Sequence, residues 1–295
     1  MGYSFVFADK RKFSIYYAIY YKTNIADSFD WNELLESASG DKYIFVMSGE
    51  RIVGGFVLSD NIINYPFMLP LVDEKVFWEQ LISYALAYCS HHDIVLNYVS
   101  ESDMTALLCI SNITLIQSNR RMARPTEKTV HNLVTKYYFV IPDEGEIDEI
   151  VKIVYESHLN GFTATVKNPD RTDIYNEIDI YNDIDRRFKL FYSTNTLHFS
   201  TLVKRKGSNE IIGVCMAGIY PDSPNQFSTI HQVSVHPSFR RQGIAAAMML
   251  HTIEKASDLS PVITLGVMIG NPAELLYEKI GFRKGASFST LRIDV

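Results

Sequence analysis

The sequence predicts an α/β protein of two domains of similar size, and three observations carry this prediction. The chain has 295 residues, more than the roughly 100–200 residues of a usual single domain. Apolar residues make up 47% and charged residues 21%, which allows real cores and argues against disorder. Strand-like and helix-like patterns alternate along the chain, and they do so in the same order in both halves.

In the first half, two strands flank Ser48-Gly49-Glu50, a turn signal that indicates a hairpin. The segment that follows carries Phe77, Leu81 and other apolar residues at helical spacing, so it predicts a helix. The expected strands and helices of this half are Lys42–Gly49, Arg51–Ser59, Asp73–Ser90, Asp93–Val99, Asp103–Ile110 and Ile113–Gln117.

The second half repeats the order of strand pair, helix, strand, helix and strand. Its strand pair flanks the turn signal Gly207-Ser208-Asn209. The expected elements are Thr201–Lys206, Ile211–Tyr220, Phe227–Val235, Gly243–Ala256, Val262–Met268, Pro272–Lys279 and Ser287–Ile293. The polar segment Asn119–Lys136 separates the halves, which predicts domains at residues 1–136 and 137–295.

Charge and cysteine content argue against several classes of protein. The formal net charge of −6 disfavours a non-specific nucleic-acid binder, which needs a basic surface. Cys89, Cys109 and Cys215 are widely spaced, and we expect buried free thiols in a reducing compartment. Residues Met1–Lys12 carry charges where a signal peptide needs an apolar core, and no apolar run of about 18 residues follows. We therefore expect a soluble, cytoplasmic protein without membrane contact.

Two polar clusters are interpreted as structural. Arg120, Arg121 and Arg124 could contact phosphate, but a solvated strand end and linker explains them better. His91 and His92 could bind a metal, but adjacent histidines at a helix C-terminus usually interact with the helix dipole. Because no third ligand of suitable spacing is near, no metal site is predicted.

The most informative segment joins the end of a strand to a helix that begins near Gly243. The unpaired N–H groups and the dipole of a first helical turn favour an anion. Gly243 has no side chain, so a pyrophosphate can approach the backbone, and Arg240 and Arg241 add positive charge. Ala245 and Ala246 keep the next positions small. The segment predicts a site for the diphosphate of a nucleotide-like cofactor, although an ordinary strand-to-helix turn can contain the same string.

A second segment, Asn271–Phe282, follows the next strand. Pro272 suits the first turn of a helix, and Gly281 suits its end. Tyr277 has a proton to give, and at the edge of a cleft it could protonate a leaving thiolate. The alternative is a core tyrosine that faces a neighbouring strand.

Together the two segments resemble the GNAT superfamily of acetyl-CoA-dependent acyltransferases. In that family the pattern R/Q-x-x-G-x-G/A opens the third helix, and A-x-x-L-Y-x-x-x-G-F forms the fourth. Arg240–Ala245 matches the first pattern and Ala273–Phe282 matches the second. The resemblance covers residues 137–295 and implies a mixed, mostly antiparallel twisted sheet flanked by helices.

The resemblance also implies a role for each residue of the site. The loop amides would hold the pyrophosphate of acetyl-CoA, and a strand that splays at a bulge would pair with the pantetheine arm. Tyr277 would be the general acid for the CoA thiolate. Asn271 would hydrogen-bond the cofactor, although it lies six residues before the tyrosine where the family usually has seven. The implied cofactor-binding residues are Val233, Ser234, Val235, Arg240, Arg241, Gln242, Gly243, Ile244, Ala245, Ala246 and Asn271.

An acceptor amine must lose a proton before it attacks, which requires a base. His231 lies on the strand that leads to the loop, and strict alternation places it on the same face as Val233 and Val235. The ordinary histidine pKa of about 6.5 suits a general base. A structural histidine is an equal alternative, and His236 is a second candidate.

The segment Asp170–Arg187 combines acidic residues with apolar residues at helical spacing. One interpretation is an amphipathic helix whose acidic face is merely solvated. The other is an acidic rim, including Asp173 and Glu177, that attracts a cationic amine to the acceptor cleft.

In the first half, the loop that corresponds to the cofactor loop is Pro66–Lys75, which has two prolines, two acidic residues and no glycine. This loop would repel a pyrophosphate, so we predict that the first half does not bind CoA. The resemblance thereby extends to tandem GNAT proteins, with a degenerate first copy that buttresses the second or walls its acceptor pocket.

Three functions follow from these features. The first is transfer of an acetyl group from acetyl-CoA to a primary amine of a small molecule or peptide. The second is the same reaction with a longer acyl-CoA, and the third is a non-catalytic acetyl-CoA-binding or regulatory protein. The presence of Tyr277 favours an enzyme.

Overall fold

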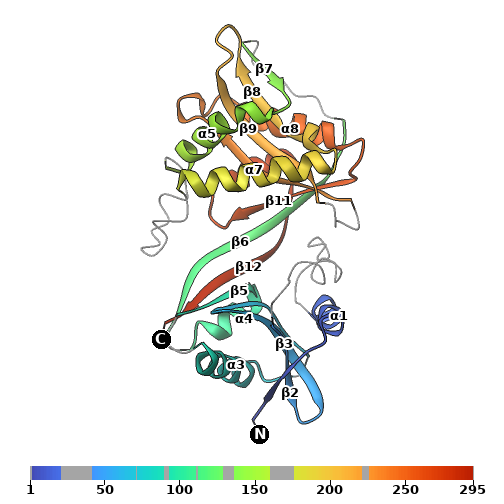
Figure 1. Cartoon of the computed structure of the whole chain (residues 1–295), viewed down its shortest axis with the longest axis vertical. Coiled ribbons are helices and arrows are strands. Elements are labelled where there is room, and N and C mark those ends of the chain that lie inside the picture. The colour runs from blue at the N-terminus through green and yellow to red at the C-terminus, as the bar shows by residue number, and fades with distance from the viewer. Residues whose placement is uncertain are drawn as a thin grey trace. The chain divides into compact units, whose positions relative to one another are not determined.

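The computed structural model describes residues 2–20, 42–70, 72–89, 93–110, 112–128, 136–159, 176–220 and 226–294. These residues form two compact units of mixed α/β structure, as predicted (Figure 1). Unit 1 comprises Met1–Arg121 and Gly285–Val295, and unit 2 comprises Met122–Lys284. This division differs from the sequence-based domains 1–136 and 137–295, because the final segment packs in unit 1.

Unit 1 is a mixed sheet with helices on both faces. Its elements are β1 (Ser4–Phe7), α1 (Lys10–Tyr20), β2 (Lys42–Ser48), β3 (Arg51–Ser59), β4 (Ile62–Met68), α3 (Glu74–Tyr88), β5 (Ile94–Ser100), α4 (Glu101–Leu107), β6 (Ile113–Pro125) and β12 (Arg283–Ile293). The strand order is β1-β2-β3-β4-β5-β12-β6, with β4 and β5 parallel. Helices α3 and α4 cover one face through Phe77 and Leu107, and α1 covers the other through Phe13 and Tyr17.

Unit 2 has the same kind of architecture. Its elements are β7 (Tyr137–Val140), η1 (Glu144–Glu146), α5 (Ile147–Leu159), α7 (Glu177–Ser193), η2 (Leu197–Phe199), β8 (Thr201–Arg205), β9 (Ile211–Ile219), β10 (Ser228–Val235), η3 (Pro237–Phe239), α8 (Ile244–Ala256), β11 (Val262–Met268) and α9 (Ala273–Lys279). The strand order is β6-β11-β10-β9-β8-β7. Helices α5 and α7 pack on one face, and α8 packs on the other (Figure 1).

The expected strands and helices are present, but several elements were missed. Strand β4 contains Pro66, which lacks the N–H of a regular strand residue. The β3–β4 register shifts between Gly55 and Val57, and this bulge accommodates the proline. Strand β6 was expected to end at Gln117, but it continues to Pro125.

Both β6 and β12 cross the division between the units, since their bounds extend on either side of it. In unit 1, β12 lies between β5 and β6, so the last strand of the chain completes the sheet of the first unit. Among the described residues, no helix is both long and apolar enough to cross a membrane.

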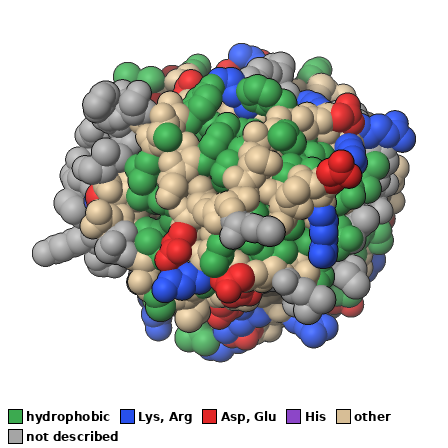
Figure 2. All heavy atoms as spheres, turned by 90° about the horizontal axis from the view of Figure 1, so that it is seen from below, with side chains coloured by type: hydrophobic (Ala, Val, Ile, Leu, Met, Phe, Trp, Pro, Cys, Tyr) green, Lys and Arg blue, Asp and Glu red, His purple; other side chains and the backbone are tan. Residues whose placement is uncertain are grey.

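Several large apolar side chains of unit 1 are exposed, and Phe7 is 74% exposed. Figure 2 shows hydrophobic side chains near the middle of one face and charged side chains mostly toward its margin. The three cysteines are free thiols. Cys215 is buried as expected, whereas Cys89 is half-buried and Cys109 is exposed, so the expectation of burial was wrong for Cys109.

Candidate active site

The central feature of unit 2 is a wedge between two parallel strands. The ladder between β10 and β11 joins Ser228–Ile230 to Ile263–Leu265, and among the described residues it ends there. Both strands continue, β10 to Val235 and β11 to Met268. The predicted splay of the strand that carries Val233 is therefore confirmed. Beyond Ile230, the edge of β10 that faces β11 has backbone groups outside that ladder.

A bulge in β10 sets the direction of the side chains around the wedge. The β9–β10 register shifts between Ile230 and Gln232, which leaves His231 as the extra residue. Val233 packs against the core on the α8 side, whereas the His231 ring lies 5.6 Å from the ring of Phe191 on α7. The expectation that His231 shares a face with Val233 and Val235 is wrong, because the bulge shifts the alternation by one residue.

Ser234 points to the face covered by α5. It is buried, and its hydroxyl lies 2.8 Å from that of Ser157 and 2.7 Å from the Gln232 side-chain amide. Val233 and Val235 pack on the opposite face. The side chains of this stretch are thus used for packing, and its backbone edge is what borders the wedge.

The loop after β10 leads into an uncapped helix. Gly243 is the N-cap of α8, has a φ of 77°, and makes no side-chain cap. The first helical hydrogen bond of the cap runs from the Ala247 N–H to the Gly243 carbonyl at 3.0 Å. The N–H groups of Ile244, Ala245 and Ala246 precede it and have no carbonyl partner within the helix. A side chain at Gly243 would meet no atom within 4 Å, so the helix start is open.

The two arginines before this helix have different surroundings. The Arg240 guanidinium donates to the Ser157 carbonyl at 3.0 Å and to the Val235 carbonyl at 3.3 Å, which ties the loop to α5 and β10. Arg241 is exposed and has a positive φ of 63°. Gln242 accepts a hydrogen bond from the Tyr137 hydroxyl at 2.9 Å. Arg240 therefore shapes the loop, and Arg241 carries the more accessible charge.

Helix α9 presents Tyr277 to the core that contains α8. The Tyr277 side chain packs on this core, 6.2 Å from the Phe282 ring. Burial, and to a smaller extent the Cys215 thiol nearby, raise the pKa of Tyr277 to about 12. The hydroxyl is therefore protonated at neutral pH.

Asn271, which was predicted to bind the cofactor, stabilises a turn of the protein through two hydrogen bonds. Its side-chain oxygen accepts a hydrogen bond from the Ala273 N–H at 2.9 Å, and its carbonyl accepts one from the Glu274 N–H at 3.0 Å. These bonds fix the turn between β11 and α9. A role toward the cofactor stays a prediction for this residue.

Arg124 holds the other end of α9, which sequence reasoning missed. Its side chain is 7% exposed and donates to the carbonyls of Ile280 and Pro125 and to Glu127. A side chain at Gly281 would meet the guanidinium at 3.3 Å. The interpretation of Arg124 as part of a solvated strand end was wrong. Because Ile280 is 156 positions away, no local sequence signal indicates this role.

On the α7 side, His231 belongs to a polar and aromatic cluster. Its Nδ1 lies 3.5 Å from the Tyr220 hydroxyl, and the two rings are 5.1 Å apart in an edge-to-face arrangement. The Arg187 Nη1 donates to the same hydroxyl at 3.3 Å. Asp183 accepts from Arg187 at 2.8 and 2.9 Å. Burial raises the pKa of Asp183, but the hydrogen bonds and charges of Arg187 and Arg186 lower it by more. The pKa therefore lies below its ordinary value, and the carboxylate is ionised at neutral pH.

The other residues predicted for the acceptor side or for a metal are not part of the His231 cluster as the structure describes it. Glu177 is exposed at the start of α7, and Asp173 lies outside the described residues, as do His91 and His92. His236 caps η3 by accepting the Ser238 N–H at 3.2 Å through Nδ1, and its Nε2 lies 3.1 Å from Glu156. Both nitrogens of His236 are thus engaged.

Comparison with known proteins identifies the domain. Residues 163–282 match the sequence profile of the acetyltransferase (GNAT) family. This part of the chain is thus similar to a GNAT-family domain, and this similarity together with the fold indicates an acetyltransferase.

Solved structures extend the likeness of fold over the whole chain. A GCN5-related N-acetyltransferase from Sphaerobacter thermophilus is 14% identical with a TM-score of 0.69, over 98% of this chain and 95% of that one. A tandem GNAT protein from the clavulanic acid biosynthesis pathway is 10% identical with a TM-score of 0.60, over 98% of both chains. These likenesses show a fold with two GNAT-like domains.

Two curated relatives share a short stretch with the chain. Cysteine-rich protein 2-binding protein of Mus musculus is 39% identical over 70 residues, and that of Homo sapiens is 41% identical over 63 residues. The stretch covers 24% and 21% of this chain, but only 9% and 8% of those proteins.

Unit 1 has the framework of the GNAT wedge with different side chains. Its parallel ladder joins Ile62 and Ile63 of β4 to Val95 and Leu96 of β5, although both strands continue beyond it. The next helix, α3, is capped by Asp73, whose carboxylate accepts the Val76 N–H at 3.0 Å.

Aromatic rings lie where the strands of unit 1 diverge. Tyr65 and Tyr98 have positive φ values of 54° and 59°, and their rings stack at 4.8 Å. The Phe288 ring of β12 stacks on Tyr98 at 5.6 Å. Beside them, the Asn97 side-chain amide donates to the Asn64 oxygen at 3.1 Å. A carboxylate thus caps the helix at the position where the GNAT domain of unit 2 has Gly243.

Proposed function

We propose that unit 2 transfers an acetyl group from acetyl-CoA to a primary amine of a small molecule or peptide, by direct attack in a ternary complex. The observation that carries this proposal is the wedge between β10 and β11, which lies beside the uncapped N-terminus of α8. The GNAT profile match supports acyl transfer as the reaction class.

The residues of the wedge suit acetyl-CoA. The first amides of α8 and the helix dipole favour a diphosphate, and Arg241 adds an exposed positive charge. Gly243 and Gly266 leave space, because a side chain at either would meet no atom within 4 Å. The backbone edge of Val233–Val235 suits the amides of the pantetheine arm, as an added strand would. When bound, acetyl-CoA supplies a thioester whose acetyl group is activated toward an amine.

Two side chains would move protons. Tyr277 keeps its proton at neutral pH, because burial raises its pKa to about 12, so it can protonate a leaving thiolate. His231 would take a proton from the amine, directly or through water. The Tyr220 hydroxyl beside Nδ1 would hold the ring in place.

The test uses the whole chain in two steps. Isothermal titration calorimetry measures acetyl-CoA binding, and a thiol-release assay then screens amines for turnover. We expect binding, turnover with at least one amine, and a Tyr277→Phe variant that binds acetyl-CoA as the wild type does but turns over more slowly.

Each of the other outcomes would favour a different function or refute the proposal. Binding without turnover on any amine would favour a regulatory acetyl-CoA-binding protein. Faster turnover with a longer acyl-CoA would favour a different acyl donor. Absence of any binding would refute the proposal.

A further inference from the structure

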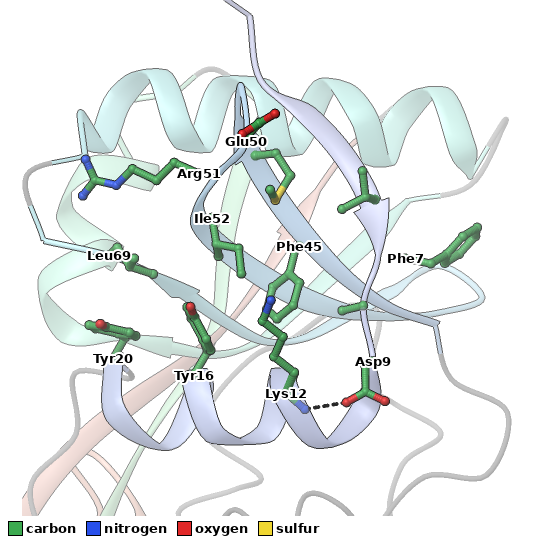
Figure 3. A pocket seen from close by; sticks show the side chains of 13 residues that line it. Phe7, Asp9, Lys12, Tyr16, Tyr20, Phe45, Glu50, Arg51, Ile52 and Leu69 are labelled. Atoms are coloured by element: carbon green, nitrogen blue, oxygen red, sulfur yellow. Dashed lines mark hydrogen bonds between the residues drawn. The ribbon is translucent and has the colours of Figure 1, made fainter.

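Unit 1 contains a cavity that is distinct from the wedge between its strands. The cavity has a volume of about 650 Å³ and lies on the face of the sheet that α1 covers (Figure 3). Its walls come from β1, α1, β2, the β2–β3 turn, the start of β3 and the residue after β4. This volume falls within the range of about 300–1,000 Å³ that is typical of small-molecule sites.

Aromatic and aliphatic side chains form most of the lining. The Tyr16 ring lies 5.5 Å from that of Phe45 and 5.8 Å from that of Tyr20, and both tyrosines are half-buried. Ile52 and Leu69 complete the apolar wall (Figure 3). Rings at these separations contact one another. Tyr16 and Tyr20 are only half-buried, so they leave ring surface and hydroxyls accessible to a flat ligand that carries polar atoms at one end.

Lys12 is exposed and contributes a positive charge to the lining of the cavity. Figure 3 shows its side chain rising from α1 toward Phe45, and its ammonium lies 5.8 Å from the centre of that ring. Asp9 also lines the cavity, but its carboxylate accepts the backbone N–H of Lys12 at 2.8 Å and so caps the start of the helix. Within the described part of the chain, no carboxylate forms an ion pair with the Lys12 ammonium.

The rim adds one further charge of each sign. Glu50 and Arg51 stand in and beside the β2–β3 turn, and the Phe7 ring points away from the cavity (Figure 3). The four charged side chains of the lining sum to zero formal charge. An anion would therefore be attracted locally, by the Lys12 ammonium over the Phe45 ring. An ammonium over an aromatic wall without a carboxylate partner attracts an anion.

We propose that this cavity binds a small planar aromatic carboxylate. Its ring would pack against Tyr16 and Tyr20, and its carboxylate would pair with the Lys12 ammonium. This proposal involves neither acetyl-CoA nor the wedge of unit 2. Its test is therefore independent of the test of the proposed transferase activity.

The probe pair is indole-3-acetate and its neutral amide, indole-3-acetamide, titrated into the full chain and followed by calorimetry. We expect saturable binding of the acid and at least about tenfold weaker binding of the amide, because the charge-assisted bond is lost. Lys12→Gln should weaken binding of the acid by about the same factor.

Lys10→Gln is the matched control. Lys10 lies on the same helix and over the ring of Tyr43 at 5.5 Å, but it does not line the cavity. Thermal unfolding of both variants checks that they are folded. The proposal is overturned if the acid does not bind, if the amide binds equally well, or if Lys10→Gln weakens binding as much as Lys12→Gln.

Discussion

The start of α8 offers the sharpest test of the cofactor site, through the substitution Gly243→Ala. Gly243 has a φ of 77°, and an added Cβ would meet no atom within 4 Å. The substitution therefore creates no clash within the protein. It places a methyl group where the backbone amides of the helix start are open.

Gly207 provides a matched control in the same unit. It has a φ of 92° in the β8–β9 turn, and an added Cβ there would also meet nothing within 4 Å. Alanine in the left-handed region costs about 1–2 kcal/mol at either position. Both variants should lose similar stability, which for a unit of this size is a fall in Tm of about 2–4 °C per kcal/mol.

Only Gly243→Ala should weaken the binding of acetyl-CoA. Loss of one charge-assisted hydrogen bond to the diphosphate costs about 1.5–3 kcal/mol, which corresponds to roughly a 10- to 150-fold higher Kd. Calorimetry measures the Kd, and thermal unfolding measures the shared strain. If the two variants bind acetyl-CoA equally well, the reasoning that places the diphosphate at this helix is refuted.

Four further predictions concern the remaining parts of the site. Tyr220→Phe removes the hydroxyl between Arg187 and His231, so kcat/KM should fall about tenfold at unchanged acetyl-CoA Kd; an unchanged pH–rate profile and rate would leave His231 as a structural residue. Arg124→Ala should lower the free energy of unfolding by about 2–3 kcal/mol, because the Ile280 carbonyl at the end of α9 loses a charged donor that is itself buried; denaturant titration checks this, and a loss below about 0.5 kcal/mol would contradict it. Charge reversal at Asp173 and Glu177 should raise the KM for a cationic amine at low salt without changing acetyl-CoA affinity; steady-state kinetics that show an unchanged KM would rule out the acidic rim. The raised pKa of Tyr277 means that its stabilising contribution is complete below about pH 10 and is lost as the pH rises toward 12; alkaline unfolding of Tyr277→Phe should lack this loss, and identical profiles would argue against burial as the cause.

The part of the site that sequence reasoning predicted well is local along the chain. A glycine before an Ala-rich helix determines an open helix start whatever lies around it, and Gly243 has no competing cap. The splay of β10 followed from the family resemblance, and the end of the ladder at Ile230 confirms it. Side-chain roles that depend on distant partners were harder to predict.

His231 and Arg124 show why the rest could not be predicted. A single extra residue at the bulge turns His231 toward α7, and periodicity alone does not indicate where a bulge lies. Arg124 stands beside other basic residues in a polar stretch, so its composition resembles a linker. Its burial depends on Ile280, which is 156 positions away in the sequence. The long strands β6 and β12 raise the same difficulty, since the pairing that extends them is not local.

The two units share a backbone framework but differ in the side chains beside it, and this difference bears on the prediction that only unit 2 binds CoA. Both units have a parallel ladder that ends early, so the backbone framework does not distinguish them. The differences lie in side chains: Asp73 places a carboxylate on the helix start of unit 1, where a diphosphate would need free amides. Tyr65 and Tyr98 adopt left-handed backbone conformations that cost free energy, and their stacked rings occupy the place where the strands diverge. Rings that already stack on one another need no ligand to satisfy their packing, which is consistent with the prediction that unit 1 does not bind CoA.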